Sequence, residues 1–213
     1  MLYLNVPYEE KNEAKSMYAR WDKDKKKWYA TNPKFYFRFA KWIEGESVAR
    51  NKVYIAVSAK ICWKCKRETP VYTFAVKNKD LIDITGRETN IEEFTGYDVA
   101  LIPINRNLPE GIKRYLVQHT NCKDKFSKTT QTTYFANTCI QCDALQGANY
   151  VYDEVDSSFG RVYSTESNQI RYIEFKLKND IAIDYQVGES VISPPVKLFS
   201  EKNVTQSNVE LFE

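Results

Sequence analysis

The sequence predicts an α+β protein made of a small strand–helix–hairpin–helix module followed by a larger, mostly antiparallel domain. Three observations predict it: positive charge is concentrated in the first fifty residues, four of the five cysteines form two C-x-x-C pairs, and short apolar runs after residue 50 are typical of strands. With 213 residues, 43% of them hydrophobic, the chain is long enough to bury a core without disulfides. The sequence contains no run of about 18 apolar residues, so it does not predict a membrane-spanning helix.

The charge pattern divides the chain into parts. The whole chain carries 31 Lys and Arg against 28 Asp and Glu, but residues 1–50 carry 11 against 7 and the remainder 20 against 21. The excess positive charge therefore lies entirely in the first fifty residues. We predict a basic module at residues 1–46, a second domain at residues 50–199 and a flexible tail at residues 200–213.

The first module carries signals for each of its elements. Residues 2–6 alternate as a strand does, and Pro7 opens a helix with acidic residues early and basic residues late. Residues 19–21 and 27–29 indicate two short strands around a lysine-rich turn. Asn32 and Pro33 are typical of a helix start, and the aromatic residues that follow have helical spacing as far as Ile43.

The lysine-rich turn and its aromatic neighbours are the candidate nucleic-acid interface. Cations contact phosphates and aromatic faces stack on bases, which is how single-stranded nucleic acid is held without sequence reading. The residues concerned are Arg20, Lys23, Lys25, Lys26, Lys27, Trp28 and Tyr29. The alternative is a solvated hairpin turn, with Trp21 and Trp28 filling the core of the module.

Five short stretches of the module form a motif. They are Leu4-Asn5-Val6-Pro7-Tyr8, Glu10-Lys11, Ala14-Lys15, Ala19-Arg20-Trp21-Asp22 and Lys27-Trp28-Tyr29. The motif resembles DUF5710, a small bacterial domain at the ends of plasmid primases and other DNA-processing proteins, over residues 2 to about 43. The resemblance implies an accessory module and supplies no catalytic residues. The chain departs from the family at Tyr18, where the family usually has Gly.

The two C-x-x-C pairs are the candidate metal centre. Cys62 and Cys65 precede Cys139 and Cys142 by 73 intervening residues. Each C-x-x-C turn directs two thiolates at one metal, and two turns complete a tetrahedral, closed shell. We predict one structural zinc per chain, with metal binding coupled to folding. A redox dithiol is the alternative, but it needs a thioredoxin-like setting that the sequence does not show.

The remaining thiol and the single histidine are near neighbours in sequence. His119 and Cys122 form His-Thr-Asn-Cys. They are potential ligands, but we interpret them as an ordinary polar histidine and a free thiol, which suits a reducing compartment. One histidine also argues against a His-dependent hydrolase.

The residues around the cysteine pairs carry a second resemblance. Residues 62–71 and 134–154 are similar to segments of uncharacterised bacterial zinc-ribbon-like proteins, including an aromatic residue and Asn137 before the second pair and Gln146-Gly147 after it. The resemblance implies zinc binding and a shared fold, and it carries no activity.

The rest of the second domain reads mainly as strands. Residues 53–59 and 71–76 indicate two strands around the first cysteine pair, a zinc hairpin, and residues 109–119 indicate a helix. Further strands are predicted at 99–102, 131–135, 149–152, 171–177 and 181–185.

An enzyme remains an alternative. Glu174 and Lys176 match the E-x-K half of a metal-dependent nuclease, with Asp153 or Asp156 as an upstream partner. The same spacing occurs by chance on helix surfaces, and on an edge strand these residues would form a solvent face.

The tail ends in a candidate linear motif. It resembles the QxxLxLF peptide that docks in the bacterial sliding clamp, with Val in place of the central Leu. The residues that would contact the clamp are Gln206, Val209, Leu211 and Phe212. The alternative is that the tail packs on its own domain or is disordered.

Together these patterns predict a cytoplasmic bacterial, plasmid or phage protein. We expect a non-catalytic, zinc-binding accessory protein that contacts nucleic acid or a DNA-processing partner. A protein–protein adaptor, for example a phage inhibitor of a host factor, and the metal-dependent nuclease are the alternatives.

Overall fold

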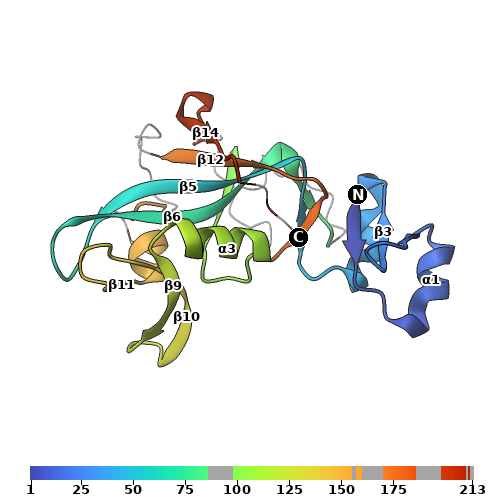
Figure 1. Ribbon diagram of the computed structural model, residues 1–213, viewed down its shortest axis with the longest axis horizontal. Coiled ribbons are helices and arrows are strands. Elements are labelled where there is room, and N and C mark those ends of the chain that lie inside the picture. The colour runs from blue at the N-terminus through green and yellow to red at the C-terminus, as the bar shows by residue number, and fades with distance from the viewer. Residues whose placement is uncertain (86–97, 155–156, 160–169, 186–197, 210, 212–213) are drawn as a thin grey trace. The chain divides into compact units, whose positions relative to one another are not determined.

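A computed structural model describes residues 1–85, 98–154, 157–159, 170–185, 198–209 and 211 (Figure 1). The chain forms two compact units, each assembled from separate segments of the sequence. Unit 1 comprises residues 1–52, 77–98 and 176–196, and unit 2 comprises residues 53–76, 99–175 and 197–213. The mixed, mostly antiparallel architecture confirms the predicted α+β class.

The first part of unit 1 is the predicted strand–helix–hairpin–helix module. Strands β1 (Leu2–Leu4), β2 (Arg20–Asp22) and β3 (Lys27–Ala30) form an antiparallel sheet in the order β1-β3-β2. A 3-10 turn at Tyr8–Glu10 leads into helix α1 (Lys11–Ser16). The second helix, Pro33–Trp42, is a 3-10 helix that Asn32 caps by accepting a hydrogen bond from the backbone of Lys34. The hydrophobic core of this module includes Leu2, Leu4, Ala14, Tyr36 and Trp42.

The second part of unit 1 is a sheet that the sequence predicted only in part. Strand β4 (Ser47–Ala49) lies between β7 (Leu81–Asp83) and β13 (Ile181–Ile183) and is antiparallel to both. Gly45 has φ +153°, and a Cβ atom there would lie 2.5 Å from the carbonyl oxygen of Ile183. The close approach of these two backbone segments therefore requires glycine at position 45.

Asp180 joins the first module to the β13 segment. Its carboxylate accepts a hydrogen bond from the Tyr36 hydroxyl at 2.6 Å. It also lies 3.5 Å from Arg50 Nε and 3.8 Å from the amino terminus of Met1. Residues 1–52 and 176–196 therefore share a partly buried polar network as well as a sheet.

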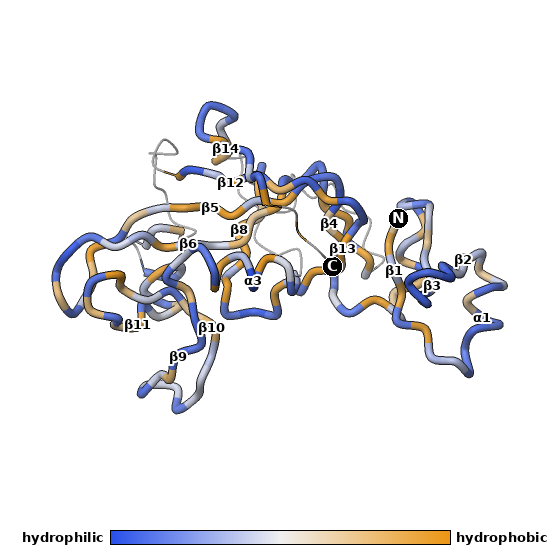
Figure 2. The backbone as a smooth tube through the Cα atoms, in the orientation of Figure 1, coloured by the Kyte–Doolittle hydropathy of each residue, from blue (hydrophilic) through white to orange (hydrophobic). Residues whose placement is uncertain are grey.

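Unit 2 is built on a five-stranded sheet in the order β14-β12-β5-β6-β8. Strands β5 (Lys52–Ile61) and β6 (Glu68–Lys77) form a long antiparallel hairpin, and hydrophobic residues follow the two strands in Figure 2. The other strands are β8 (Val99–Ile102), β12 (Arg171–Lys176) and β14 (Val204–Gln206), and helix α3 spans Glu110–His119.

A second, smaller sheet follows helix α3 in sequence. Strands β9 (Cys122–Ser127), β10 (Thr132–Thr138) and β11 (Leu145–Gln146) pair antiparallel in the order β11-β10-β9. The prediction of a strand at residues 149–152 was wrong, because Asn149–Asp153 forms a π-helix. Its adjacent residues Val151 and Tyr152 are both buried, which a helical turn permits and an alternating strand does not.

The predicted domain limits stay predictions, although the grouping of segments differs from them. Residues 1–46 lie within unit 1, which also draws on later parts of the chain. Residues 201–203 form a 3-10 turn and residues 204–206 form β14, which runs parallel to β12, in the segment predicted as a flexible tail. Among the described residues, no helix is both long enough and apolar enough to cross a membrane.

Candidate metal centre and basic aromatic pocket

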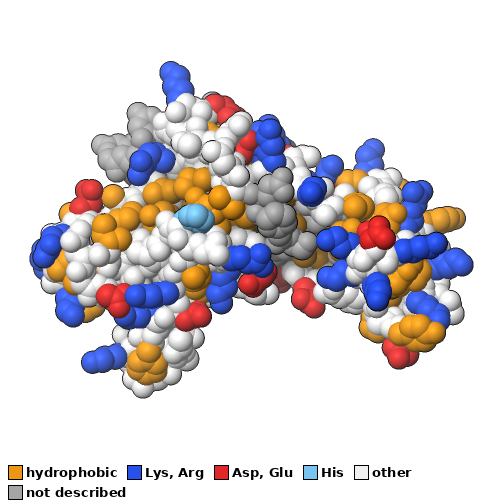
Figure 3. All heavy atoms as spheres, in the orientation of Figure 1, with side chains coloured by type: hydrophobic (Ala, Val, Ile, Leu, Met, Phe, Trp, Pro, Cys, Tyr) orange, Lys and Arg blue, Asp and Glu red, His pale blue; other side chains and the backbone are white. Residues whose placement is uncertain are grey.

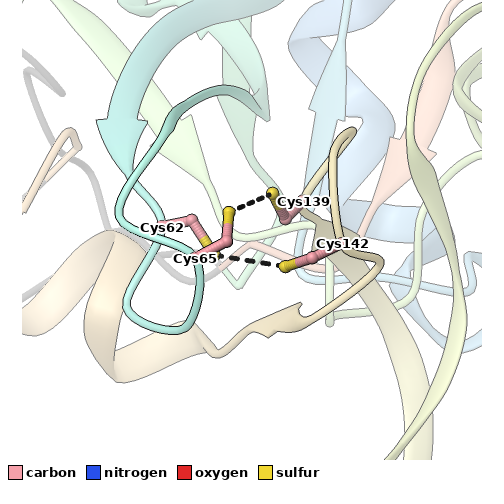
Figure 4. A group of neighbouring side chains, drawn as sticks. All are labelled: Cys62, Cys65, Cys139 and Cys142. Atoms are coloured by element: carbon pink, nitrogen blue, oxygen red, sulfur yellow. Dashed lines mark hydrogen bonds between the residues drawn. The ribbon is translucent and has the colours of Figure 1, made fainter.

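The four predicted cysteines come together in unit 2. Cys62 and Cys65 lie between β5 and β6, and Cys139 and Cys142 lie between β10 and β11. Their sulfur atoms all lie within 4.8 Å of one another (Figure 4). Cys62 contacts Cys142 and Cys65 contacts Cys139, both at 3.7 Å between sulfurs. Both close contacts therefore join one C-x-x-C pair to the other.

These sulfur positions suit a tetrahedral metal ion. Four sulfurs bonded to zinc at about 2.3 Å lie about 3.8 Å from one another. The two contacts of 3.7 Å match that spacing. Within the described part of the chain, this is the one group of three or more Cys, His, Asp or Glu side chains placed to share a metal. The cluster is able to hold a metal ion such as zinc.

The two cysteine turns have the same backbone structure. We call residues 62–67 the first knuckle and residues 139–144 the second knuckle. In each, the N–H of the first cysteine donates to the carbonyl five residues later, at 2.8 Å to Arg67 and 2.9 Å to Ala144. In each, the residue after the second cysteine has positive φ, 60° at Lys66 and 56° at Asp143. The repeated geometry gives each pair of sulfurs the same orientation toward the centre.

Asn137 connects the second knuckle to the five-stranded sheet. Its side-chain oxygen accepts from the backbone N–H of Tyr72 at 2.8 Å, and its side-chain nitrogen donates to the carbonyl of Tyr72 at 3.0 Å. Thr69 Oγ1 also accepts from the N–H of Ile140 at 3.2 Å. These bonds hold β10 beside β6 and so bring together cysteines that are far apart in sequence.

The thiols of the cluster differ in acidity. Burial opposes ionisation of Cys139, but the N–H groups of Gln141 and Cys142 outweigh it and lower the pKa of Cys139 to about 6. Although the N–H of Ala144 favours its thiolate, burial and the neighbouring sulfurs raise the pKa of Cys142 to about 11. Four thiolates therefore ionise together only when a cation offsets their mutual repulsion.

Cys122 and His119 lie outside the cluster, as we interpreted them. Cys122 is buried and donates through its sulfur to Asn137 Oδ1 at 3.4 Å, and desolvation raises its pKa to about 12. His119 is exposed, and its ring lies 4.6 Å from the ring of Tyr115. Neither side chain is placed to ligate the same metal as the four cysteines.

The predicted basic hairpin is present in unit 1, and its register separates two faces. Arg20 is opposite Tyr29, Trp21 is opposite Trp28, and Asp22 is opposite Lys27. Because directly opposite residues share a face, Arg20, Lys27 and Tyr29 lie on one face and the two tryptophans on the other. Lys23, Lys25 and Lys26 are exposed in the turn between the strands.

A pocket of about 430 Å³ lies beside this hairpin. Lys26, Lys27 and Trp28 line it, together with residues outside the predicted interface: Leu4, Asn5, Val6, Tyr8, Lys11 and Trp21. The rings of Trp21 and Trp28 meet edge to face, with centroids 5.5 Å apart. Lys11 Nζ lies 3.7 Å from the centre of the Tyr8 ring, and its ammonium group lowers the pKa of Tyr8. The pocket thus combines aromatic walls with three ammonium groups.

The pocket gathers some of the predicted interface residues and not others. Arg20, Lys23, Lys25 and Tyr29 do not line the pocket, whereas Lys27, which shares a face of the hairpin with Arg20 and Tyr29, does reach it. The interpretation of Trp21 as a core residue was wrong, because 47% of it is exposed. Figure 3 shows Lys and Arg side chains gathered over this part of unit 1.

Comparison with known families identifies the part of the chain that carries this pocket. Residues 1–44 match the family described as Domain of unknown function (DUF5710). Residues 1–44 are a DUF5710 domain. Two proteins of Escherichia coli named DNA primase TraC are similar to the chain, with 49% identity over 47 residues and 46% over 48 residues. Each match covers 22% of this chain and 3% or 4% of the relative, and no solved structure matches.

Tyr18 lies in the turn that ends helix α1 of the DUF5710 domain. Tyr18 has φ 68°, and it directly follows the cap residue of α1. The N–H of Tyr18 donates to the carbonyl of Lys15, and the N–H of Ala19 donates to that of Ala14, both at 3.0 Å. These bonds are those of a Schellman motif, in which this position favours glycine.

The remaining candidate residues are dispersed in the structure. Glu174 is buried in β12, where Tyr54 donates to its carboxylate at 3.4 Å, and Lys176 is exposed. No carboxylate cluster accompanies Glu174 among the described residues, and Asp156 lies outside them. Of the tail, Gln206 belongs to β14, Val209 is exposed, Leu211 is partly buried, and Phe212 lies outside the described residues.

Proposed function

We propose that this protein is a non-catalytic, zinc-binding accessory protein whose DUF5710 domain contacts single-stranded nucleic acid. The observation that carries the proposal is the pocket lined by Tyr8, Trp21 and Trp28 together with Lys11, Lys26 and Lys27. Single-stranded nucleic acid is held by aromatic faces that stack on bases and by cations that contact phosphates.

The size of the pocket sets how much nucleic acid it takes. Small-ligand sites have volumes of about 300–1,000 Å³. A pocket of about 430 Å³ is near the lower end and fits one nucleotide unit of a strand. In this arrangement one base stacks on the exposed indole ring of Trp21, which Trp28 supports edge to face. The ammonium groups of Lys11, Lys26 and Lys27 then neutralise the adjoining phosphates.

The similarity of the DUF5710 domain to other proteins supports this assignment. Two proteins that share about half of its residues carry the name DNA primase. Because the similarity covers only a small part of those proteins, it supports a nucleic-acid setting and gives no activity to this chain.

The metal has a structural role in this proposal. Four cysteine ligands leave no coordination position open for substrate, which is characteristic of structural zinc sites. Because the knuckles come from β5–β6 and from β10–β11, a bound zinc would join the two sheets of unit 2. The proposed zinc therefore stabilises unit 2 and takes no part in contacting nucleic acid.

The test is fluorescence anisotropy of labelled single-stranded and double-stranded oligonucleotides with the full chain. We expect Trp21→Ala to weaken single-strand binding about 5- to 100-fold, because stacking on one aromatic ring contributes about 1–3 kcal/mol per base. Removing the charge of Lys26 or Lys27 should reduce the salt dependence by about 0.7 in the slope of log K against log salt.

Lys34→Ala is the matched control, because Lys34 is exposed in the same module and does not line the pocket. It should leave both affinity and salt dependence nearly unchanged. Equal binding by wild type and Trp21→Ala would refute the proposal. So would tighter binding to double-stranded than to single-stranded oligonucleotides.

A further inference from the structure

The first knuckle presents a second basic aromatic surface, in unit 2. We call Trp63, Lys64, Lys66 and Arg67 the knuckle surface, and all four side chains are exposed. We propose that the knuckle surface is an additional contact site for a nucleic-acid strand, in which Trp63 stacks on a base and the three cations contact phosphates. This contact is separate from the DUF5710 pocket and stands on different residues.

Trp63 has the features of a rigid stacking platform. It is 52% exposed, although large aromatic side chains are usually well buried. Its indole N–H donates to the carbonyl of Leu145 at 2.7 Å, and the N–H of Lys66 donates to the carbonyl of Cys62 at 3.0 Å, which closes the backbone turn around Trp63. The ring is therefore already fixed before a ligand arrives, so that little side-chain entropy is lost on binding.

Comparison of the two knuckles shows that the charge is specific to the first one. Lys66 and Asp143 occupy the same position of the same turn. Asp143 is paired with Lys123, at 2.6 Å, and with Lys125. Among the described residues, neither Lys64 nor Lys66 pairs with an acidic side chain, and Glu68 is the nearest acidic residue in sequence. The second knuckle therefore forms the same turn without cations at these positions, so the turn itself does not require Lys64 or Lys66.

Arg67 adds a directional donor to this surface. One of its terminal nitrogens donates to Gln141 Oε1 at 3.2 Å, which fixes the guanidinium across the two knuckles. A guanidinium has five N–H donors, so others remain for a phosphate oxygen. Figure 3 shows Lys and Arg side chains at this end of the β5–β6 hairpin.

The combination of groups favours a nucleic-acid strand over an acidic peptide. Cations alone would suit either ligand, but a fixed aromatic face between cations matches the alternation of base and phosphate along a strand. A structural tetrathiolate zinc carries a formal charge of −2, which would favour some nearby cations. However, Cys62 and Cys139 are buried, whereas the side chains of Lys64, Lys66 and Arg67 are exposed to solvent. Compensation of the zinc charge therefore does not account for all of this exposed positive charge.

The experiment uses the full, zinc-loaded chain and a fluorescein-labelled oligothymidylate of about 20 nucleotides, long enough for more than one contact. Trp63→Ala should weaken binding about 5- to 50-fold, and Trp63→Phe should retain most of it, because phenylalanine still stacks. Lys64→Ala and Lys66→Gly should each reduce the salt slope by about 0.7. Glycine is chosen for Lys66 because the backbone has positive φ there.

Lys128→Ala is the matched control, an exposed lysine in the turn at the other end of β10, and it should change neither quantity. Zinc content is measured for each variant, so that a loss of binding is attributed to the surface only where the metal is retained.

The outcomes distinguish this inference from the proposed function. Repeating Trp63→Ala in a Trp21→Ala chain should weaken the remaining binding further. If Trp21→Ala weakens binding and Trp63→Ala has no effect, the knuckle contact is refuted while the DUF5710 proposal stands. If poly-glutamate displaces the oligonucleotide from wild type and from Trp63→Ala equally well, the surface binds polyanions in general and the inference is also refuted.

Discussion

Six residues other than glycine have positive φ in the described part of the chain, and three of them end a helix or a cysteine turn. Tyr18 follows helix α1, and Lys66 and Asp143 follow the second cysteine of each knuckle. A left-handed conformation costs an L-residue roughly 1–2 kcal/mol, because Cβ crowds the following carbonyl. The backbone hydrogen bonds around each residue maintain the conformation despite this cost.

Replacing Tyr18 with glycine should therefore stabilise the DUF5710 domain. Tyr18 is 85% exposed, so the substitution removes little packing. Relief of the left-handed strain exceeds the added flexibility of the unfolded chain, and we expect a gain of about 0.5–1 kcal/mol in the free energy of unfolding. Urea denaturation measures it, with Tyr18→Ala as control. An equal gain in the alanine variant would contradict the strain argument.

The buried thiol of Cys122 predicts a loss of stability at alkaline pH. Desolvation raises its pKa from 9.0 to about 12 in the folded chain. Because the folded pKa lies above the unfolded value, its contribution is complete below about pH 9 and is lost as the pH rises toward about 12. The slope reaches at most about 1.4 kcal/mol per pH unit.

Urea denaturation at several pH values above 9.0, the ordinary cysteine pKa, provides the measurement. Cys122→Ser should lose stability less steeply than wild type, because serine does not ionise in this range. Parallel curves for the two chains would show that Cys122 does not titrate as its burial requires.

At the scale of elements, the sequence predicted long apolar strands well and short or polar strands poorly. Strands β5, β6 and β12 carry strong patterns and were found. Strand β9 was missed because its sequence, Cys-Lys-Asp-Lys-Phe-Ser, is mostly polar and exposed. Strand β4 was missed because three buried residues are too few to show a period. The order of strands in a sheet depends on contacts between distant segments, which no local pattern contains.

The candidate sites follow the same division. Cysteine spacing predicted the cluster, because two C-x-x-C pairs have few other uses. The motif of the first module contained Tyr8, Lys11 and Trp21, but only the folded structure shows that these three residues line one pocket. Likewise, the sequence places Asn137 just before the second cysteine pair, but only the folded structure shows its two hydrogen bonds to the backbone of Tyr72.

Loss of the Asn137 side chain should weaken the link between β6 and β10. Asn137 is buried and makes two hydrogen bonds to the backbone of Tyr72. Asn137→Ala leaves the N–H of Tyr72 without this acceptor and leaves its carbonyl with the Tyr152 hydroxyl as donor, at 3.3 Å. We expect a destabilisation of about 1–3 kcal/mol, the cost of one unsatisfied buried group. Thermal unfolding of the zinc-loaded chain measures it. The exposed Asn149 gives a matched control, and an equal effect of Asn149→Ala would contradict the proposed link.

Metal content should depend on the knuckle cysteines and not on Cys122. Elemental analysis should find about one zinc per chain, because four cysteine sulfurs that share one metal would form one closed tetrahedral site. Cys139→Ser should lose the metal, and Cys122→Ser should keep it. Retention of a full equivalent of zinc by Cys139→Ser would rule out the four-cysteine site.

At the scale of the whole molecule, the chain consists of two units with separate stabilising centres. The cysteine cluster belongs entirely to unit 2, and the Asp180 network belongs entirely to unit 1. The charge pattern indicated two parts. It did not indicate that unit 1 contains segments from three regions of the sequence, because the pairing of β4 with β13 spans more than half of the chain.

This division predicts that the two units respond to different perturbations. Calorimetry should resolve two unfolding transitions, of which chelation of the metal lowers one. Asp180→Ala should lower the other, because it removes the acceptor of Tyr36 and leaves Arg50 without this partner. Asp184→Ala, a nearby carboxylate after β13, is the control. A single transition that both perturbations lower equally would contradict independent centres.

The discontinuity of unit 1 also has a consequence during synthesis on the ribosome. Strand β4 is made early, but its partner β13 follows about 130 residues later, which at roughly 5–20 residues per second is on the order of 10 s. For that time the buried residues of β4 have no β13 to cover them. The nascent chain therefore offers the unpaired edge of β4 to chaperones, or to β4 of a neighbouring chain on the same messenger, until residue 183 leaves the exit tunnel.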